Sequence, residues 1–110
     1  MFVQVEQKSF YVLVTLRGRV DSFNLEFVKI KLRTLIKSGK KFIALDLQNV
    51  EFLGLAASLE FENTANELQN HKGHLYIIGN NQRTSLLQRT FQKHVTYISN
   101  ETEVRQISHD

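Results

Sequence analysis

The hydrophobic and polar positions of the chain follow two periods, one typical of strands and one typical of helices. Residues 2–6 (FVQVE) alternate apolar and polar side chains, and residues 10–16 (FYVLVTL) form a second apolar run after a short turn at 7–9. These two runs predict an N-terminal hairpin. Residues 42–47 (FIALDL) are apolar except for Asp46, which is typical of a strand buried on both faces of a parallel sheet. We expect them to form the central strand.

The segment that follows the central strand is the candidate site. We expect Gln48 and Asn49 to leave the sheet and Gly54 to turn the chain into a helix that begins near Leu55. In open α/β sheets, binding sites lie outside the carboxyl ends of the strands. Function is therefore expected near residues 52–58.

Helical spacing marks two amphipathic segments on either side of the central strand. Residues 18–22 (GRVDS) are expected to end the preceding strand, and either Asp21 or Ser22 can cap the first helix. Its apolar face consists of Leu25, Val28, Leu32, Leu35 and Ile36, and Ser38-Gly39-Lys40 closes it. The second covers residues 55–70. We expect its inner face to comprise Leu55, Leu59, Ala65 and Leu68 and its outer face Glu60, Glu62 and Glu67, with Phe61 fitting neither.

The remaining pattern completes an α/β order. It predicts a strand at 74–79, a helix at 82–93, a short strand at 95–99 and a terminal helix from about residue 101. Alternating strands and helices of this kind require crossover connections and a largely parallel sheet. We predict one domain over residues 1–110, an α/β sandwich in which an N-terminal hairpin precedes a mostly parallel sheet with crossover helices.

The composition excludes several classes of protein. An apolar fraction of 42% and a charged fraction of 23% are ordinary for a globular domain. No apolar run reaches the roughly 20 residues of a membrane helix, and the N-terminus lacks the order of a signal peptide, so we expect a cytoplasmic protein that does not span a membrane. There is no cysteine, and His71 and His74 lie around a turn without a carboxylate to complete a ligand set. We predict neither a metal nor a cofactor.

No motif supports catalysis. Residues 79–82 (GNNQ) contain one glycine, too few for a phosphate-binding loop, and no Ser/His/Asp or paired-carboxylate spacing is present. The polar stretch at 80–85 either presents groups to a ligand or caps the third helix, and capping is the commoner role. The sequence therefore predicts a protein that is not an enzyme.

A series of short motifs then identifies a family. In order, they are Gly18-Arg-Val-Asp21, Ser38-Gly39, Leu45-Asp46-Leu47 with Val50-Glu-Phe52, and Gly73 before the fourth strand. Their order and spacing resemble the STAS domain, the fold of bacterial anti-sigma-factor antagonists and of the cytoplasmic tails of sulfate transporters. The resemblance covers nearly the whole chain.

The resemblance also points to a missing hydroxyl. In the family, the loop after the central strand usually reads Asp-Ser-Ser-Gly-Leu, and a kinase that is also the anti-sigma factor phosphorylates its second serine. Placing Phe52-Leu53 on the apolar pair before this motif aligns it with Gly54, Leu55, Ala56, Ala57 and Ser58. The acceptor position is then Ala56, which cannot take phosphate. Ser58 is the nearest hydroxyl, and a structural role is favoured for it.

The resemblance implies a protein-interaction module. We expect residues 52–58 to bind an anti-sigma factor, a kinase or another signalling protein without the usual switch. Asp21 lies close to this loop in the family, although an aspartate here can simply cap a helix. Asp46 is expected at a strand end, bonded to nearby N–H groups or a cation. The alternatives are the STAS subunit of a lipid-transport ABC system, which binds an ATPase, and a sensor of a small molecule or nucleotide.

The charge pattern predicts no specific binding to nucleic acid. The net charge is +3, and lysine and arginine are spread along the chain rather than gathered in one tract. Affinity for duplex DNA should be weak and vanish near physiological salt, because it would rest on phosphate contacts alone. Fluorescence anisotropy of a labelled duplex over a salt series measures this. Sequence-specific binding that persists at physiological salt would contradict the prediction.

Overall fold

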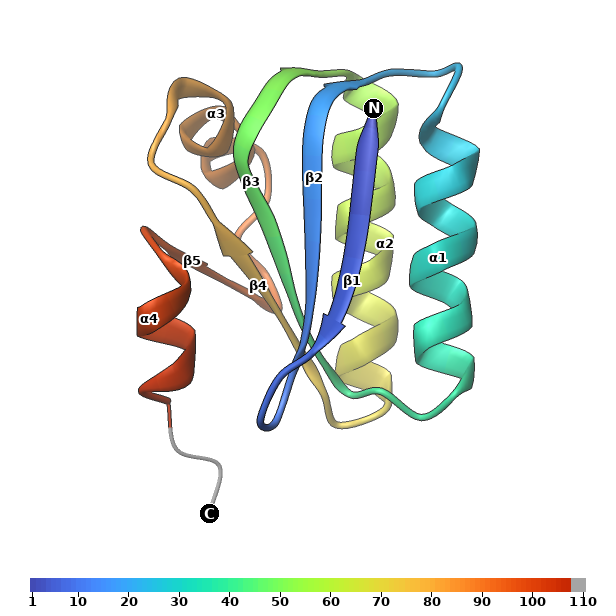
Figure 1. The fold of residues 1–110 in the computed structure, drawn as a ribbon, viewed down its shortest axis with the longest axis vertical. Coiled ribbons are helices and arrows are strands. Elements are labelled where there is room, and N and C mark those ends of the chain that lie inside the picture. The colour runs from blue at the N-terminus through green and yellow to red at the C-terminus, as the bar shows by residue number, and fades with distance from the viewer. Residues whose placement is uncertain (108–110) are drawn as a thin grey trace.

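The computed structural model describes residues 1–107. Strands and helices follow one another in the predicted order (Figure 1). The elements are β1 (Phe2–Gln7), β2 (Val12–Val20), α1 (Leu25–Lys37), β3 (Phe42–Leu53), α2 (Leu55–Asn70), β4 (His74–Ile78), α3 (Gln82–Thr90), β5 (Val95–Ile98) and α4 (Glu101–Arg105).

The strands form one five-stranded sheet in the order β1-β2-β3-β4-β5. β1 pairs antiparallel with β2, and every other neighbouring pair is parallel. The predicted hairpin, the mostly parallel sheet and the central position of β3 are therefore confirmed. The apolar run of residues 42–47 is buried on both faces, as its composition predicted, apart from half-buried Phe42 and Asp46.

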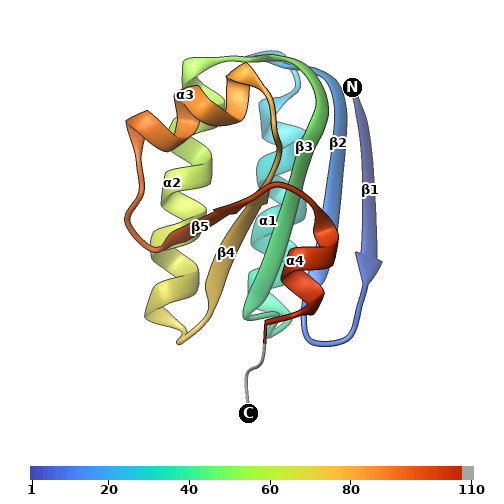
Figure 2. The same cartoon turned by 90° about the vertical axis from the view of Figure 1, so that its left-hand side faces the viewer.

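Helices cover the two faces of the sheet unequally. In Figure 2, α1 and α2 lie on one side of the strands and α4 lies on the other. The larger core joins alternate strand residues such as Val14, Leu45 and Ile77 to the inner faces of α1, α2 and α3. The smaller core, on the opposite face, packs Val104 of α4 with Tyr11, Leu13, Ala44, Tyr76 and Ile78.

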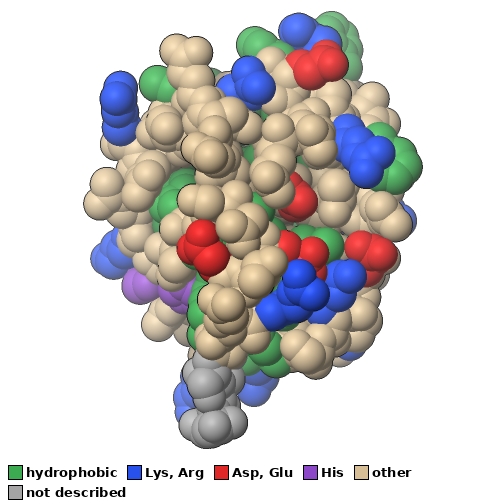
Figure 3. Space-filling model, turned by 60° about the vertical axis from the view of Figure 1, so that its left-hand side comes forward, with side chains coloured by type: hydrophobic (Ala, Val, Ile, Leu, Met, Phe, Trp, Pro, Cys, Tyr) green, Lys and Arg blue, Asp and Glu red, His purple; other side chains and the backbone are tan. Residues whose placement is uncertain are grey.

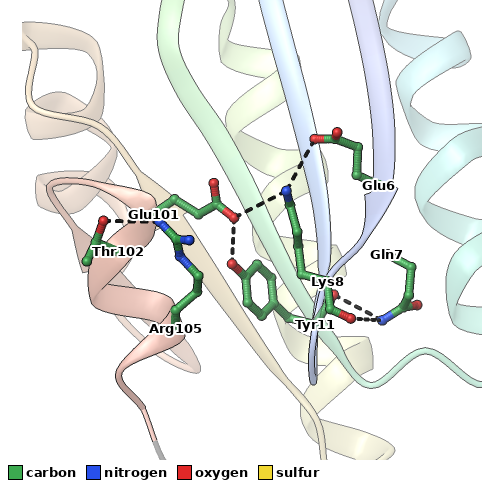
Figure 4. A network of polar contacts seen from close by, with 7 residues as sticks. All are labelled: Glu6, Gln7, Lys8, Tyr11, Glu101, Thr102 and Arg105. Atoms are coloured by element: carbon green, nitrogen blue, oxygen red, sulfur yellow. Dashed lines mark hydrogen bonds and ion pairs between the residues drawn. The ribbon is translucent and has the colours of Figure 1, made fainter.

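A polar network ties α4 to the turn of the hairpin (Figure 4). The hydroxyl of buried Tyr11 donates a hydrogen bond of 2.6 Å to Oε2 of Glu101. Lys8 Nζ lies 3.9 Å from the same oxygen and 3.9 Å from Glu6 Oε2. Burial, together with the hydrogen bond to the Glu101 carboxylate, raises the pKa of Tyr11, so its hydroxyl stays protonated as a donor.

Asn81 caps α3, as the polar stretch predicted. Its side-chain oxygen accepts from the backbone N–H of Thr84 at 3.0 Å, and the Thr84 hydroxyl lies 3.2 Å from the backbone N–H of Asn81. The Asn81 amide also donates to the carbonyl of Leu47 at 3.3 Å. The same residue therefore starts the helix and fixes it to β3.

One strand runs further than the sequence indicated. β2 ends at Val20, within the predicted stretch 18–22, whereas β3 continues past Gln48 and Asn49 to Leu53. The pairing of β3 with β4 stops at Asp46, whereas its pairing with β2 continues to the end through two register shifts. Beyond Asp46 the strand has lost one neighbour, so polar side chains are exposed there although the backbone remains in the sheet.

The predicted inner face of α2 is partly wrong. Leu55 and Leu59 are 74% and 54% exposed, whereas Phe61 is fully buried and Glu60 is also buried. The buried side is Ala57, Glu60, Phe61, Thr64, Ala65 and Leu68. Glu60 can be buried because Arg33 Nη2 of α1 lies 3.0 Å from its carboxylate, and Arg33 also pairs with Glu67.

Charges are mixed over the face drawn in Figure 3. Lysine and arginine side chains lie among aspartate and glutamate, and no patch of one sign covers this face. Among residues 1–107, no helix combines the length and the apolar character needed to cross a bilayer.

Gly73 provides a test of the packing of the α2–β4 connection against Lys41, the residue before β3. A Cβ at this position would overlap the backbone carbonyl of Lys41, which accepts a hydrogen bond of 2.9 Å from His74 N–H. We expect Gly73→Ala to lower the free energy of unfolding by about 1–3 kcal/mol, because backbone atoms must shift. Urea unfolding followed by circular dichroism measures this.

Gly54→Ala is the matched control. A Cβ there would meet its nearest atoms at 3.6 Å, and the residue has a φ of −74°, which alanine adopts freely. The control should cost about 0.5 kcal/mol or less, from its position at a helix start. Equal destabilisation of the two variants would show that the close contact at Gly73 is unimportant.

Candidate functional site

Two connections meet at the carboxyl ends of β2 and β3. Val20 and Leu53 are opposite each other in the parallel pair, and the N–H of Gly54 donates to the carbonyl of Val20 at 3.0 Å. Because both strands end at the same edge, the chain enters α1 and α2 side by side (top of Figure 1). The candidate segment 52–58 therefore faces the β2–α1 connection.

The β2–α1 connection is held by reciprocal hydrogen bonds. Oδ1 of Asp21 accepts from the backbone N–H groups of Phe23 and Asn24 at 3.0 and 3.3 Å. In return, the Asn24 side chain accepts from the N–H of Asp21 at 3.0 Å and donates to the carbonyl of Arg19 at 2.8 Å. This arrangement leaves the Phe23 side chain 96% exposed.

The β3–α2 junction presents an aromatic ring and an uncapped helix start. Gly54 is the N-cap residue of α2, with no side-chain cap and no acidic residue in the first turn. The first backbone N–H groups of a helix have no partner within it and carry a partial positive charge. Before the turn, the guanidinium of Arg19 lies 4.3 Å from the centre of the Phe52 ring, which is 40% exposed.

The two connections enclose an open hollow. It has a volume of about 370 Å³ and is lined by Arg19, Asp21, Ser22, Phe23, Phe52, Gly54, Leu55, Ala56 and Ala57. A groove of about 280 Å³ between α1 and α2 is lined by Ser22, Leu25, Glu26, Lys29, Ala56, Leu59, Glu60 and Asn63. Ser22 and Ala56 line both, so the hollow adjoins the groove.

Only part of the predicted segment is exposed. Phe52, Leu55 and Ala56 face solvent, whereas Leu53, Gly54 and Ser58 are half-buried. The side chain of Ala57 is buried in the core, so this residue is a poor candidate for contact with a partner. We use "loop surface" for the exposed residues around the hollow and groove: Phe23, Phe52, Leu55, Ala56 and Leu59.

The two aspartates differ in their relation to this surface. Asp21 lines the hollow and shapes the connection beside it. Asp46 was expected at a strand end, and this is wrong, because β3 continues to Leu53. Its Oδ1 accepts from the N–H of Gln48 at 3.0 Å, within the strand and away from the loop.

Phe23 and Leu59 were missed as candidates. The sequence pattern places Leu59 on the inner face of α2, and it assigns no role to Phe23. A signal was available around the start of α1: Phe23 of the β2–α1 connection and Phe27 and Ile30 of α1 are spaced by four and three residues, and all three are exposed. Apolar residues repeated on the outer side of a helix indicate an interaction surface.

The loop surface offers apolar and cationic contacts rather than reactive groups. Within residues 1–107, no three histidine, aspartate or glutamate side chains are placed to share a metal ion. His74 lies away from the hollow, with its Nε2 atom 2.7 Å from Oγ1 of Thr96. The arrangement therefore suits binding.

The family model of the STAS domain matches residues 2–98, so the chain belongs to the STAS-domain family. No curated protein matches the chain in sequence.

Solved structures of anti-sigma-factor antagonists share the fold. SpoIIAA in its unphosphorylated form is 18% identical, with a TM-score of 0.78 over 96% of this chain and 100% of that one. The phosphorylated form of Bacillus SpoIIAA is 15% identical, with a TM-score of 0.80 over 97% and 100%. An anti-sigma factor antagonist from Mycobacterium paratuberculosis is 17% identical, with a TM-score of 0.80 over 99% and 94%. At these identities the similarity concerns the fold.

Two leucines at the junction should behave differently when truncated. Leu53 is half-buried against the larger core, so we expect Leu53→Ala to lower the free energy of unfolding by about 1–3 kcal/mol. Leu55 is mostly exposed, so Leu55→Ala should change it by about 0.5 kcal/mol or less. Chemical denaturation of both variants beside the wild type tests this. A large loss for Leu55→Ala would mean that the leucine supports the fold and is not a free contact residue.

Proposed function

We propose that this STAS domain is a non-enzymatic interaction module of the anti-sigma-factor-antagonist type, and that the loop surface binds its protein partner. The observation that carries the proposal is the exposure of large apolar side chains from two adjoining connections around one hollow. The partner is a cytoplasmic signalling protein such as an anti-sigma factor or a kinase. The proposal rests on the family and on this surface together.

The kind of partner follows from the chemistry of the surface. Exposed apolar groups cost free energy in water, and aromatic residues in particular contribute large contact area when a protein covers them. Phe23, Phe52 and Leu55 surround a hollow wide enough to accept a partner side chain. Arg19, stacked on Phe52, adds a cation at the rim that an acidic group on the partner can meet.

The contact is proposed to be permanent rather than switched by phosphate. SpoIIAA, a different protein, has solved structures in its unphosphorylated and phosphorylated forms. Here the position that aligns with the family's acceptor is Ala56, which is exposed at the start of α2 and has no hydroxyl. Ser58 is half-buried and lines a small hollow with Leu53, Arg83 and Leu86.

The alternatives differ in what binds. An ATPase of a lipid-transport system would use the same apolar contacts, so the identity of the captured partner decides between it and an anti-sigma factor. A sensor of a small molecule or nucleotide would instead bind its partner only when the ligand is present. Partner binding by the purified chain without added ligand therefore argues against the sensor.

Ala56→Asp tests the surface with little risk to the fold. A negative charge in the first turn of α2 is favourable for the helix dipole, so the free energy of unfolding should stay within about 0.5 kcal/mol. Partner affinity should fall about tenfold or more, because a charge would be buried among apolar groups. The partner is first captured on the tagged wild-type chain and identified by mass spectrometry, and then titrated by calorimetry.

Asn66→Asp is the control, since it places the same charge on an exposed position in the C-terminal half of α2. It should leave affinity within about twofold of the wild type, because a rim or distant charge has a small effect on binding. If Ala56→Asp folds normally and binds as tightly as the wild type, the loop surface is not the interface.

Incubation with the captured kinase and ATP should add no phosphate to the loop. Intact-mass measurement checks this, with Ala56→Ser as the matched variant that restores a hydroxyl at the aligned position. Phosphate on the wild type, mapped to Ser58, would show that the alignment of the loop is shifted and that a switch is present.

A further inference from the structure

β1 is an edge strand without the usual protection. It ends the sheet order, and no strand of residues 1–107 pairs with its outer side. Its sequence FVQVEQ contains no proline and no lysine, and its six pairs with β2 follow one another without a bulge. Natural edge strands are commonly blocked by such residues or by bulges, because unpaired backbone groups recruit further strands.

The hydrogen bonding of the hairpin shows which backbone groups are free for another strand. The N–H of Lys8 donates to the carbonyl of Tyr11 at 2.9 Å, which makes these two residues a bonded pair. In an antiparallel ladder, bonded and non-bonded pairs alternate. Gln4 and Glu6 therefore bond to β2, whereas the N–H and C=O groups of Val3, Val5 and Gln7 point outward.

The side chains of β1 differ between its two faces. Val3 and Val5 lie opposite Leu16 and Val14, on the face covered by α1 and α2, and Val5 is still 39% exposed. Phe2, Gln4 and Glu6 lie on the other face. There the guanidinium of Arg17 is 4.9 Å from the centre of the Phe2 ring, which is 46% exposed.

We propose that two copies of the chain pair through β1 in antiparallel orientation, with the two-fold axis at Gln4. Val3 of each copy then lies opposite Val5 of the other. The two symmetric Val3–Val5 pairs can form hydrogen bonds, because the backbone groups of both residues point outward. The exposed part of Val5 is covered by valine from the second copy, on the face of the larger core. A two-fold axis is the ordinary symmetry of a dimer, and it requires antiparallel strands.

Charge selects this register over its neighbour. With the axis at Gln4, Glu6 of the second copy lies opposite Phe2, beside the Arg17 guanidinium that covers the ring. With the axis at Val5, Lys8 would take that place and set two cations side by side. Opposite charges on neighbouring strands stabilise a sheet and like charges destabilise it. Among residues 1–107 of the single chain, the ion-pair partner of Glu6 is Lys8, at 3.9 Å.

The dimer does not depend on the proposed function. The loop surface lies at the carboxyl ends of β2 and β3, whereas the paired edge is the outer side of β1. Leu55→Ala should therefore leave dimerisation unchanged. A loss of partner binding can therefore be distinguished from a loss of dimerisation.

Amide hydrogen exchange tests the geometry residue by residue. As the concentration rises from roughly 10 μM to 1 mM, sedimentation should show a reversible dimer, as expected for a small interface. Over the same range, the amides of Val3 and Val5 should become protected from exchange. Those of Gln4 and Glu6 should be protected at the lowest and at the highest concentration alike. A monomer throughout, or a dimer without this alternation, overturns the proposal.

A charge exchange tests the register. Glu6→Arg and Arg17→Glu should each weaken the dimer about tenfold, and the double variant should restore it to within about threefold of the wild type. Val5→Pro removes an outward N–H but no hydrogen bond to β2, which an edge strand tolerates, and should abolish the dimer while the monomer stays folded. If Val5→Pro unfolds, the charge exchange still decides. A dimer that the charge variants do not weaken, or that Leu55→Ala breaks, contradicts pairing through β1.

Discussion

The parallel pairing of β2 with β3 is the contact on which the rest of the arrangement depends. It continues to the last residue of both strands, where Val20 lies opposite Leu53. Only because neither strand ends early do the two connections stand next to each other and share the hollow. The two register shifts within this pair contribute to this arrangement, because they let two strands of unequal length end side by side.

The sequence predicted most of the architecture because the strongest apolar patterns were also the buried ones. The run around Leu45 and the stripe through Val28 and Leu32 form the core as expected. The errors have a common cause. Gln48 and Asn49 are polar because β4 has ended beside them, and a single sequence does not show where a neighbouring strand stops.

The face of α2 was misjudged for a related reason. A glutamate is expected to face solvent, but Glu60 is buried because Arg33 of α1 forms an ion pair with it. This pair could not be foreseen from spacing, since its members lie on different elements and meet only after folding. Once Glu60 counts as inward, Phe61 takes a regular place beside Ala57 and Leu68, and Leu55 and Leu59 move to the outer side.

The side chains of Asp21 and Asn24 fix the β2–α1 connection through four hydrogen bonds, two between these residues and one each to Phe23 and Arg19, and this has a consequence for the kinetics of binding. A connection already fixed in one conformation loses little backbone entropy when it is covered, whereas a loose one must be ordered at that moment. Phe23 is thus already in position for the proposed contact. Encounter would then be limited by diffusion and orientation rather than by rearrangement of the loop, and differences between partners would appear mainly in how slowly they leave.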